Sequence, residues 1–159
     1  MTAADDERHM RVAIEASRAA LAAGNFPYGA ALVSAAGELL HVSQNNQVTS
    51  GDCTGHAETV LIREVCASKG AALLEGATVY ASGEPCAMCA GALFWARVAR
   101  VVFGAGNAGI MRVGGPPTLA LGAASVLATG SHTVVVSGPV LEPEALAVIA
   151  EKAARGVAR

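Results

Sequence analysis

Apolar residues along this chain follow helical spacing in some stretches and strand spacing in others, and the two kinds of stretch alternate to its end. Apolar spacings of three and four, with glycine or proline at the boundaries, predict helices over residues 5–23, 56–67, 85–98, 118–128 and 142–155. Short aliphatic and β-branched runs predict strands over residues 29–34, 38–43, 78–81, 100–103 and 133–137. Residues 44–54, which are polar, and 104–117, which are rich in glycine, are expected to form loops.

The order of these segments predicts the directions of the strands. The first two strands are joined by the short segment Ala35-Ala36-Gly37 and should form a hairpin. Strands separated by a helix need a crossover and run parallel where they are neighbours. The strand beginning at residue 100 should therefore be parallel to the one before it, and so should the strand beginning at residue 133 if helix 118–128 forms. We predict one α/β domain over residues 1–159 with a five-stranded mixed sheet.

Composition adds expectations about partners and location. The chain has 159 residues, of which 53% are hydrophobic and only 15% charged, so part of the apolar surface is expected to be buried between subunits. A net charge of −2 without a basic face argues against nucleic acid as a partner. No apolar run reaches the length of about 18 residues that indicates a membrane span. The start of the sequence lacks a signal-like apolar core, so we expect reduced cysteines and a cytoplasmic protein.

Two short motifs carry the candidate chemistry. They are His56-Ala57-Glu58 and Pro85-Cys86-Ala87-Met88-Cys89. One imidazole and two thiolates suit zinc and leave a fourth tetrahedral position open for water. Cys86 and Cys89 are three residues apart at a predicted helix start, where they share one face and where thiolates are stabilised. We predict one Zn²⁺ per subunit bound by His56, Cys86 and Cys89, with Glu58 as the catalytic acid and base.

Other interpretations of the cysteine pair are a redox site and a structural zinc site. A structural zinc would need a fourth protein ligand, and Cys53 is the only nearby candidate. A zinc-stabilised interaction domain without catalysis is a third alternative, but such a site has no use for Glu58.

The amino-acid sequence also resembles a known family. Residues 82–97, 100–104, 26–30 and 54–58 look like the cytidine and deoxycytidylate deaminase superfamily, whose zinc-dependent nucleobase deaminases carry the signature H-x-E…P-C-x-x-C. The similarity is to the branch of bacterial guanine deaminases and tRNA adenosine deaminases, and it covers most of residues 1–104. It implies a three-layer α/β/α sandwich with the last two strands parallel, and a homodimer.

The resemblance also implies substrate contacts from six positions: Asn45, Ala57, Cys86, Trp95, Phe26 and Tyr28. Asn45 corresponds to an asparagine that contacts the ring edge of the base, although a turn residue is the alternative. The backbone N–H groups of Ala57 and Cys86 correspond to donors near the water and the developing anion. Trp95 corresponds to an aromatic residue that lines the pocket, the alternative being a core or interface residue. Phe26 and Tyr28 either stack on the substrate or pack the loop.

The similarity fades after Phe103, where the sequence becomes rich in glycine, alanine, proline and valine. Neither Glu142 nor Glu144 can be assigned as a second proton shuttle, and the basic residues expected of a tRNA enzyme are few. The predicted function is hydrolytic deamination of a free base or related heterocycle, such as guanine or another aminopurine, a cytosine-like base or an aminotriazine. Deamination of tRNA adenosine, or of a nucleoside such as guanosine or cytidine, is the alternative.

Overall fold

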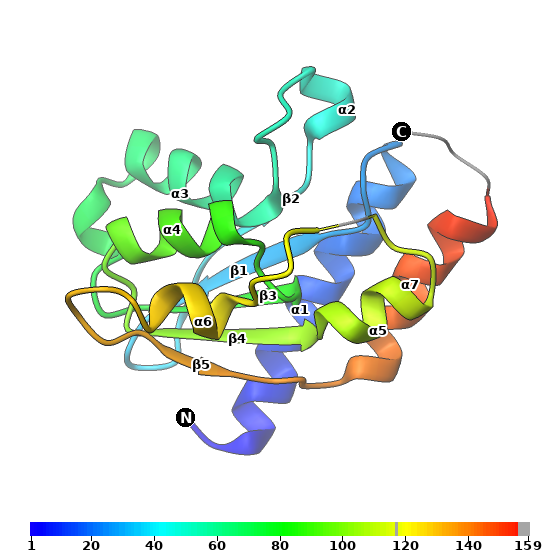
Figure 1. Ribbon diagram of the computed structural model, residues 1–159. Coiled ribbons are helices and arrows are strands. Elements are labelled where there is room, and N and C mark those ends of the chain that lie inside the picture. The colour runs from blue at the N-terminus through cyan, green and yellow to red at the C-terminus, as the bar shows by residue number, and fades with distance from the viewer. Residues whose placement is uncertain (117, 156–159) are drawn as a thin grey trace.

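The fold is an α/β/α sandwich around one mixed sheet, seen in a computed structural model that describes residues 1–116 and 118–155 (Figure 1). The strands are β1 (Gly29–Val33), β2 (Leu39–Gln44), β3 (Thr78–Gly83), β4 (Arg100–Ala105) and β5 (Val135–Ser137). The helices are α1 (Ala3–Ala22), α2 (Gln47–Ser50), α3 (Ala57–Ser68), α4 (Ala87–Trp95), α5 (Asn107–Arg112), α6 (Ala123–Leu127), α7 (Glu142–Ala154) and the 3₁₀ turn η1 (Ala71–Leu73). None of the helices in the described ranges combines the length and apolarity needed to cross a bilayer.

The five strands lie in the order β2-β1-β3-β4-β5, and their directions confirm the predicted topology. β1 is antiparallel to β2, as expected for a hairpin, and it is also antiparallel to β3 on its other side. β3 and β4 are parallel, as are β4 and β5, because a helical crossover separates each pair along the chain. The carboxyl ends of β3 and β4 therefore open at the same edge of the sheet, which positions the site described below.

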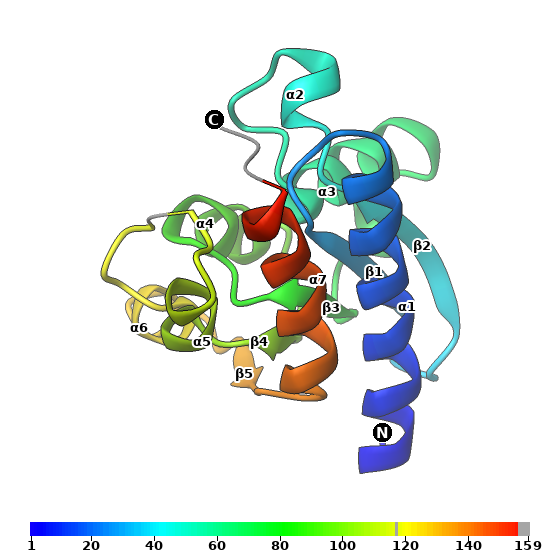
Figure 2. The ribbon, with the colours of Figure 1, turned by 90° about the vertical axis from the view of Figure 1, so that its right-hand side faces the viewer.

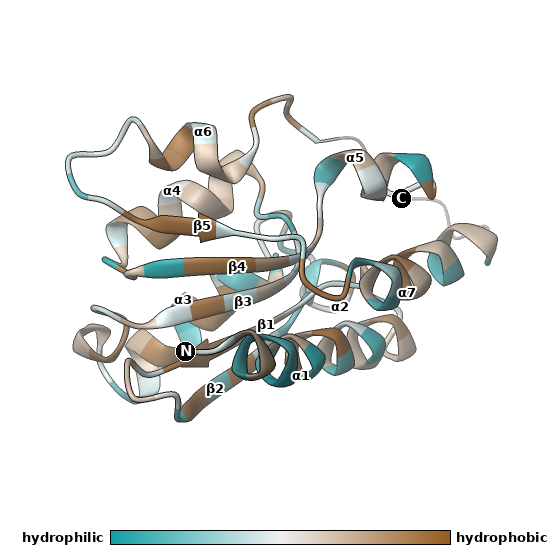
Figure 3. Cartoon of the chain, turned by 90° about the horizontal axis from the view of Figure 1, so that it is seen from below, coloured by the Kyte–Doolittle hydropathy of each residue, from teal (hydrophilic) through white to brown (hydrophobic). Residues whose placement is uncertain are grey.

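Alternating side chains of the central strands bury the two faces of the sheet against different helices. Leu32, Val79 and Val101 pack with residues of α3, α4 and α6. Their neighbours on the opposite face, such as Tyr80 and Val102, pack with α1 and α7 (Figure 2). In Figure 3 the central strands are mostly hydrophobic, whereas α1 alternates between hydrophilic and hydrophobic residues along its length. Every residue of β1 and β3 is buried, because helices cover both faces of the sheet at these central strands.

The region after β4 differs from the sequence-based expectation. Residues 104–117 were expected to be a loop, but they contain α5, while Pro117 lies outside the described residues. The predicted helix 118–128 is limited to α6, which starts only after Gly122. The first amides of both short helices donate to Glu84, a residue far away in the sequence. Local patterns could not predict these helix starts because the capping group comes from another element.

One partly buried ion pair joins α1 to the sheet. Arg100, at the start of β4, donates two hydrogen bonds of 2.7 Å to the two carboxylate oxygens of Asp6, and the Tyr80 hydroxyl donates a third of 2.6 Å. The hydrogen bonds from Arg100 and Tyr80 hold the pKa of Asp6 below its usual range, against the opposing effect of burial. The carboxylate therefore stabilises the folded state above the pKa of the unfolded chain, and this contribution is lost as the pH falls through the folded value.

We expect Asp6→Asn to lower the free energy of unfolding at pH 7 by about 2 kcal/mol, because it weakens a charge-assisted bidentate pair. The difference from the wild type should begin to shrink below about pH 4, the unfolded pKa, and should disappear as the pH falls through the lower pKa of the folded wild-type carboxyl. Urea unfolding at several pH values measures this. Glu7→Gln, which removes only an exposed pair with Arg11, is the control and should change stability by less than about 0.5 kcal/mol. Equal losses in both variants would contradict the assignment.

Candidate metal centre

Two helix starts bring the predicted ligands together at the carboxyl end of β3. His56 is the N-cap residue of α3 and Cys86 the N-cap residue of α4, both with extended backbone. Cys89 lies in the first turn of α4, so its sulfur faces the same side as that of Cys86. These three are the one group of possible metal ligands found among the described residues.

The donor atoms have the spacing that zinc requires. The distances are 3.6 Å from Cys86 Sγ to His56 Nδ1, 3.5 Å from Cys89 Sγ to the same nitrogen, and 3.6 Å between the two sulfurs. Tetrahedral zinc with bonds of about 2.0 and 2.3 Å places such donors about 3.5–3.8 Å apart. The residues fit the ion without rearrangement.

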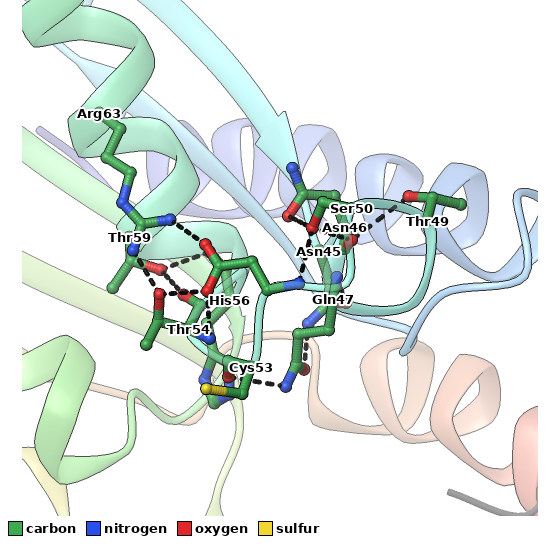
Figure 4. Close-up of polar contacts among 11 residues, drawn as sticks. Asn45, Asn46, Gln47, Thr49, Ser50, Cys53, Thr54, His56, Thr59 and Arg63 are labelled. Carbon is green, nitrogen blue, oxygen red and sulfur yellow. Dashed lines mark hydrogen bonds and ion pairs between the residues drawn. The ribbon is translucent and has the colours of Figure 1, made fainter.

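The loop before α3 holds His56 through polar contacts with its neighbours (Figure 4). The Thr59 hydroxyl donates to the carbonyl of His56 at 2.9 Å. Arg63 donates to Asp52 at 2.8 Å and also to the hydroxyl of Thr54, which ties the loop to α3. Cys53 belongs to this loop but is exposed and is not part of the ligand group, so the geometry does not support it as a fourth ligand.

The two thiols differ in acidity because they share one proton. Hydrogen bonds from Cys89 and His56 to the thiolate lower the pKa of Cys86 to about 4. The same hydrogen bond, together with burial and the nearby charge of Glu58, raises the pKa of the Cys89 thiol. The thiolate of Cys86 in turn raises the pKa of His56. Binding of a dication must therefore displace protons from this cluster.

Glu58 is buried next to the ligand group. Its side chain is 6% exposed, and burial raises the pKa of the carboxyl. It lines a small cavity of about 70 Å³ together with two of the ligands. The cavity is lined by Tyr28, His56, Glu58, Gly83, Glu84, Cys86, Asn107, Ile110, Pro116 and Thr118. A carboxyl group that retains its proton more readily than usual is suited to proton transfer at this position.

The other residues expected to contact substrate are only partly brought together. Tyr28 lines the cavity, and Asn45 lies beside it, with its N–H donating to the carbonyl of Tyr28 at 2.9 Å. The Asn45 side chain is buried and exchanges two hydrogen bonds with Gln47, which is the turn contact considered as its alternative. Phe26 is not one of the cavity-lining residues. Instead, the Lys152 ammonium lies over its ring, 3.5 Å from the ring centroid, in a cation–π contact.

Ala57 and Cys86 lie at the helix starts, where backbone N–H groups have no partner within the helix. Both amides are therefore available beside the ligand group.

Trp95, which is expected to line the pocket, lies away from the metal ligands within the single chain. Trp95 is the last residue of α4, nine positions after Cys86, and a helix rises about 1.5 Å per residue. It therefore lies at the opposite end of the helix from the ligands, 82% exposed, beside a separate hollow lined by Ile62 and Cys66.

Several cavity residues were not found from the sequence. Asn107, Ile110, Pro116 and Thr118 come from the glycine-rich region after β4, which carries no recognisable motif. Glu84 stands directly before the Pro85-Cys86 pair, and this proximity to the ligands is the one signal that could have identified it.

Comparison with known proteins agrees with this geometry. Residues 3–105 match the family model "Cytidine and deoxycytidylate deaminase zinc-binding region". A probable cytosine deaminase of Schizosaccharomyces pombe is 36% identical over 89% of this chain and 88% of its own length. A tRNA-specific adenosine deaminase of Bacillus subtilis is 44% identical over 63% of this chain, a match that spans less than two thirds (62%) of that protein. The solved structure of a guanine deaminase from Nitrosomonas europaea superposes with a TM-score of 0.76 at 26% identity, covering 93% of this chain and 84% of that one.

The chain therefore belongs to the cytidine and deoxycytidylate deaminase family. The predicted zinc cofactor and the prediction of a hydrolytic deaminase are confirmed at the level of the family. The three-layer fold with its last two strands parallel is confirmed as well.

Zinc binding should release protons and tighten as the pH rises. Cys89, whose pKa is raised, gives up its proton on binding, and the protonated fraction of His56 adds to this, whereas Cys86 is already a thiolate at pH 7. We expect about one to two protons per ion at pH 7. Calorimetric titration of the metal-free protein in buffers of different ionisation enthalpy measures this number.

Cysteine variants provide the control for this prediction. Cys53→Ser should retain one zinc per chain and the same proton release, while Cys89→Ser should bind zinc at least about tenfold more weakly. Loss of zinc from Cys53→Ser to the same extent as from Cys89→Ser would show that the ligand set is wrong.

Proposed function

We propose that this protein hydrolyses the exocyclic amine of a free nucleobase or related heterocycle and releases ammonia. The base would be guanine or another aminopurine, a cytosine-like pyrimidine or an aminotriazine. The observation that carries this proposal is the buried Glu58 carboxyl beside the His56, Cys86 and Cys89 group in one small cavity. A single catalytic domain over residues 1–159 is part of the same proposal.

Each group at the cavity has a separate role in the proposed reaction. When bound, zinc in such an open site provides a water-derived nucleophile at neutral pH. Glu58 accepts one proton from water and delivers it to the ring nitrogen, then takes the second proton of the same water and delivers it to the departing amine, a role that its raised pKa favours. The backbone N–H groups of Ala57 and Cys86 stabilise charge that develops on the substrate. Tyr28 packs against the base, and Asn45 contacts its ring edge.

The lining of the cavity favours a neutral, amine-bearing base over a phosphorylated substrate. Among the described residues that line it, two are carboxylates, Glu58 and Glu84, and none is lysine or arginine. Phosphate recognition commonly uses guanidinium or ammonium groups, and two carboxylates oppose it. The small volume of the cavity, about 70 Å³, supports a compact ligand.

Deamination of tRNA adenosine is the second candidate, because a tRNA-specific enzyme is 44% identical over the matched region. Such an enzyme needs phosphate contacts and binds RNA in a strongly salt-dependent way. The net charge of −2 and the cavity lining favour the free base. Nucleosides such as guanosine and cytidine carry a ribose but no phosphate, so in size and charge they lie between a free base and tRNA.

Ammonia release should be measured with guanine, cytosine, adenine, their nucleosides, aminotriazines and an anticodon hairpin. We expect turnover of at least one free base and none of the hairpin. With that base, Glu58→Gln should lower kcat by at least about a thousandfold while zinc stays bound, because the proton carrier is removed and the ligands are not.

Glu38→Gln removes an exposed carboxylate far from the motif and serves as the matched control, with unchanged activity expected. Full activity in zinc-loaded Glu58→Gln would refute the role of Glu58. Turnover of the hairpin alone would refute the free-base substrate and favour the tRNA alternative.

We further propose that two copies associate through the exposed face of α4, which agrees with the dimer expected from the sequence. Trp95 and Met88 on this helix are 82% and 38% exposed, and a Cβ added at Gly91 would have open space around it. Exposed tryptophan next to small residues is typical of a surface that another chain covers. Cytoplasmic location, also expected from the sequence, is supported by the four cysteines being free thiols.

Sedimentation equilibrium at micromolar concentration should give a dimer, and Trp95→Glu should shift it towards monomer by at least about tenfold in dissociation constant, since it places a charge in an apolar contact. The control is Val48→Glu, which changes an equally apolar but distant exposed residue of α2. A monomeric wild type, or equal weakening by both variants, would contradict this interface.

A further inference from the structure

The cavity has a roof that comes from the chain after β4. Asn107 and Ile110 of α5, together with Pro116 and Thr118 from the segment that leads to α6, line it from this side. α5 follows the end of β4, while α6 packs against α4 (Figures 1 and 2). α5 lines the cavity itself, and Pro116 and Thr118 lie along the chain between α5 and α6, so the positions of both helices affect the space above the metal ligands.

A single carboxylate holds the first residues of both helices. Glu84 Oε2 accepts a hydrogen bond of 3.0 Å from the backbone N–H of Asn107, the first residue of α5. Glu84 Oε1 accepts another of 3.1 Å from the backbone N–H of Ala123, the first residue of α6. The N-cap residues of both helices are glycines, Gly106 and Gly122, which have no side chain to make these contacts themselves. Glu84 thus replaces two local caps from a distance in sequence.

The space around Glu84 is fitted to this arrangement. A Cβ added at Gly122 would lie 2.5 Å from Glu84 Oε1, which is too close for any real contact. The backbone of Gly122 has φ −71°, which every residue can adopt, so glycine is needed here for space and not for conformation. The Glu84 carboxylate can reach the first amide of α6 only because residue 122 has no side chain.

The two helices are not equally dependent on Glu84. A second carboxylate, Glu142 at the start of α7, accepts a hydrogen bond of 3.2 Å from the N–H of Gly106 and so supports α5 from the other side. No other side chain caps the start of α6 among the described residues. Loss of Glu84 should therefore release α6 more than α5.

We propose that Glu84 is a positioning residue that fixes the starts of α5 and α6, and with them the roof residues of the zinc cavity, and thereby sets the affinity for the base. Its effect on substrate rests on the proposed function, whereas its effect on the roof does not. Apparent affinity falls in proportion to the fraction of molecules whose roof is in place, while chemistry in the closed molecules is unchanged. The signature of such a role is a rise in KM with little change in kcat.

The first test is Glu84→Gln, which keeps the shape of the side chain but offers one acceptor and one NH₂ group to two N–H donors. Amide hydrogen exchange should become faster in peptides from α6 and, less strongly, from α5, and stay unchanged in α1. Zinc content should remain at one per chain. KM for the base turned over fastest by the wild type should rise about tenfold, the size expected for one lost charge-assisted hydrogen bond, with kcat changed by less than about threefold. Glu38→Gln is the matched control and should alter none of these.

The second test leaves the carboxylate in place. Gly122→Ala should displace Glu84 and reproduce both the faster exchange and the higher KM. In the Glu84→Ala background, Gly122→Ala should add almost nothing, because the clashing atom is gone. This pair tests the proposal even if Glu84→Gln fails to fold.

The outcomes separate this proposal from the proposed function. Unchanged exchange in α6 in both Glu84→Gln and Gly122→Ala would overturn the anchor, as would fully additive effects in the double variant. Faster exchange with unchanged KM would overturn its role towards substrate. If the wild type turned over no base, the proposed function would fail, and exchange in α5 and α6 would still decide whether Glu84 holds the roof.

Discussion

The close approach of one imidazole and two thiol groups is the constraint on which the rest of this structure depends. Three donor atoms lie within 3.6 Å of one another, and two of them are on N-cap residues of different helices. This requires α3 and α4 to begin side by side at one edge of the sheet, which the neighbouring strands make possible. Without a cation, the cluster must retain protons on sulfur and nitrogen. Metal binding is therefore coupled to the release of these protons.

Two carboxylates next to this cluster serve different purposes. Glu58 is buried at the start of α3, where desolvation raises its pKa and suits it to carry protons. Glu84 is half-buried at the end of β3, and both of its oxygens are occupied by backbone N–H groups of the roof. One group is thus left free for chemistry, while the other is used to shape the cavity.

A short segment combines several of these tasks. Residues 82–89 contain the end of β3, the roof anchor and both cysteine ligands. Gly83 is the last residue of β3 and directly precedes Glu84. A Cβ added at Gly83 would come within 2.8 Å of the Tyr28 ring and 3.2 Å of Ile110. Wall, roof and metal ligands therefore meet at one point of the backbone, and a shift in any of them is transmitted to the others.

Local patterns in the sequence were sufficient for the strands, their directions and the metal ligands. Strand runs and crossovers depend on neighbouring residues, and the spacing of Cys86 and Cys89 places both sulfurs on one helical face whatever surrounds them. Within the single chain Trp95 lies away from these ligands, because the length of α4 separates it from Cys86. α5 and the late start of α6 could not be foreseen, because the first amides of these helices are capped by a carboxylate 23 and 39 residues away. The sequence alone thus determined the zinc chemistry, whereas the tertiary structure decided what encloses it, since hydrogen bonds between distant segments leave no periodic pattern in the chain.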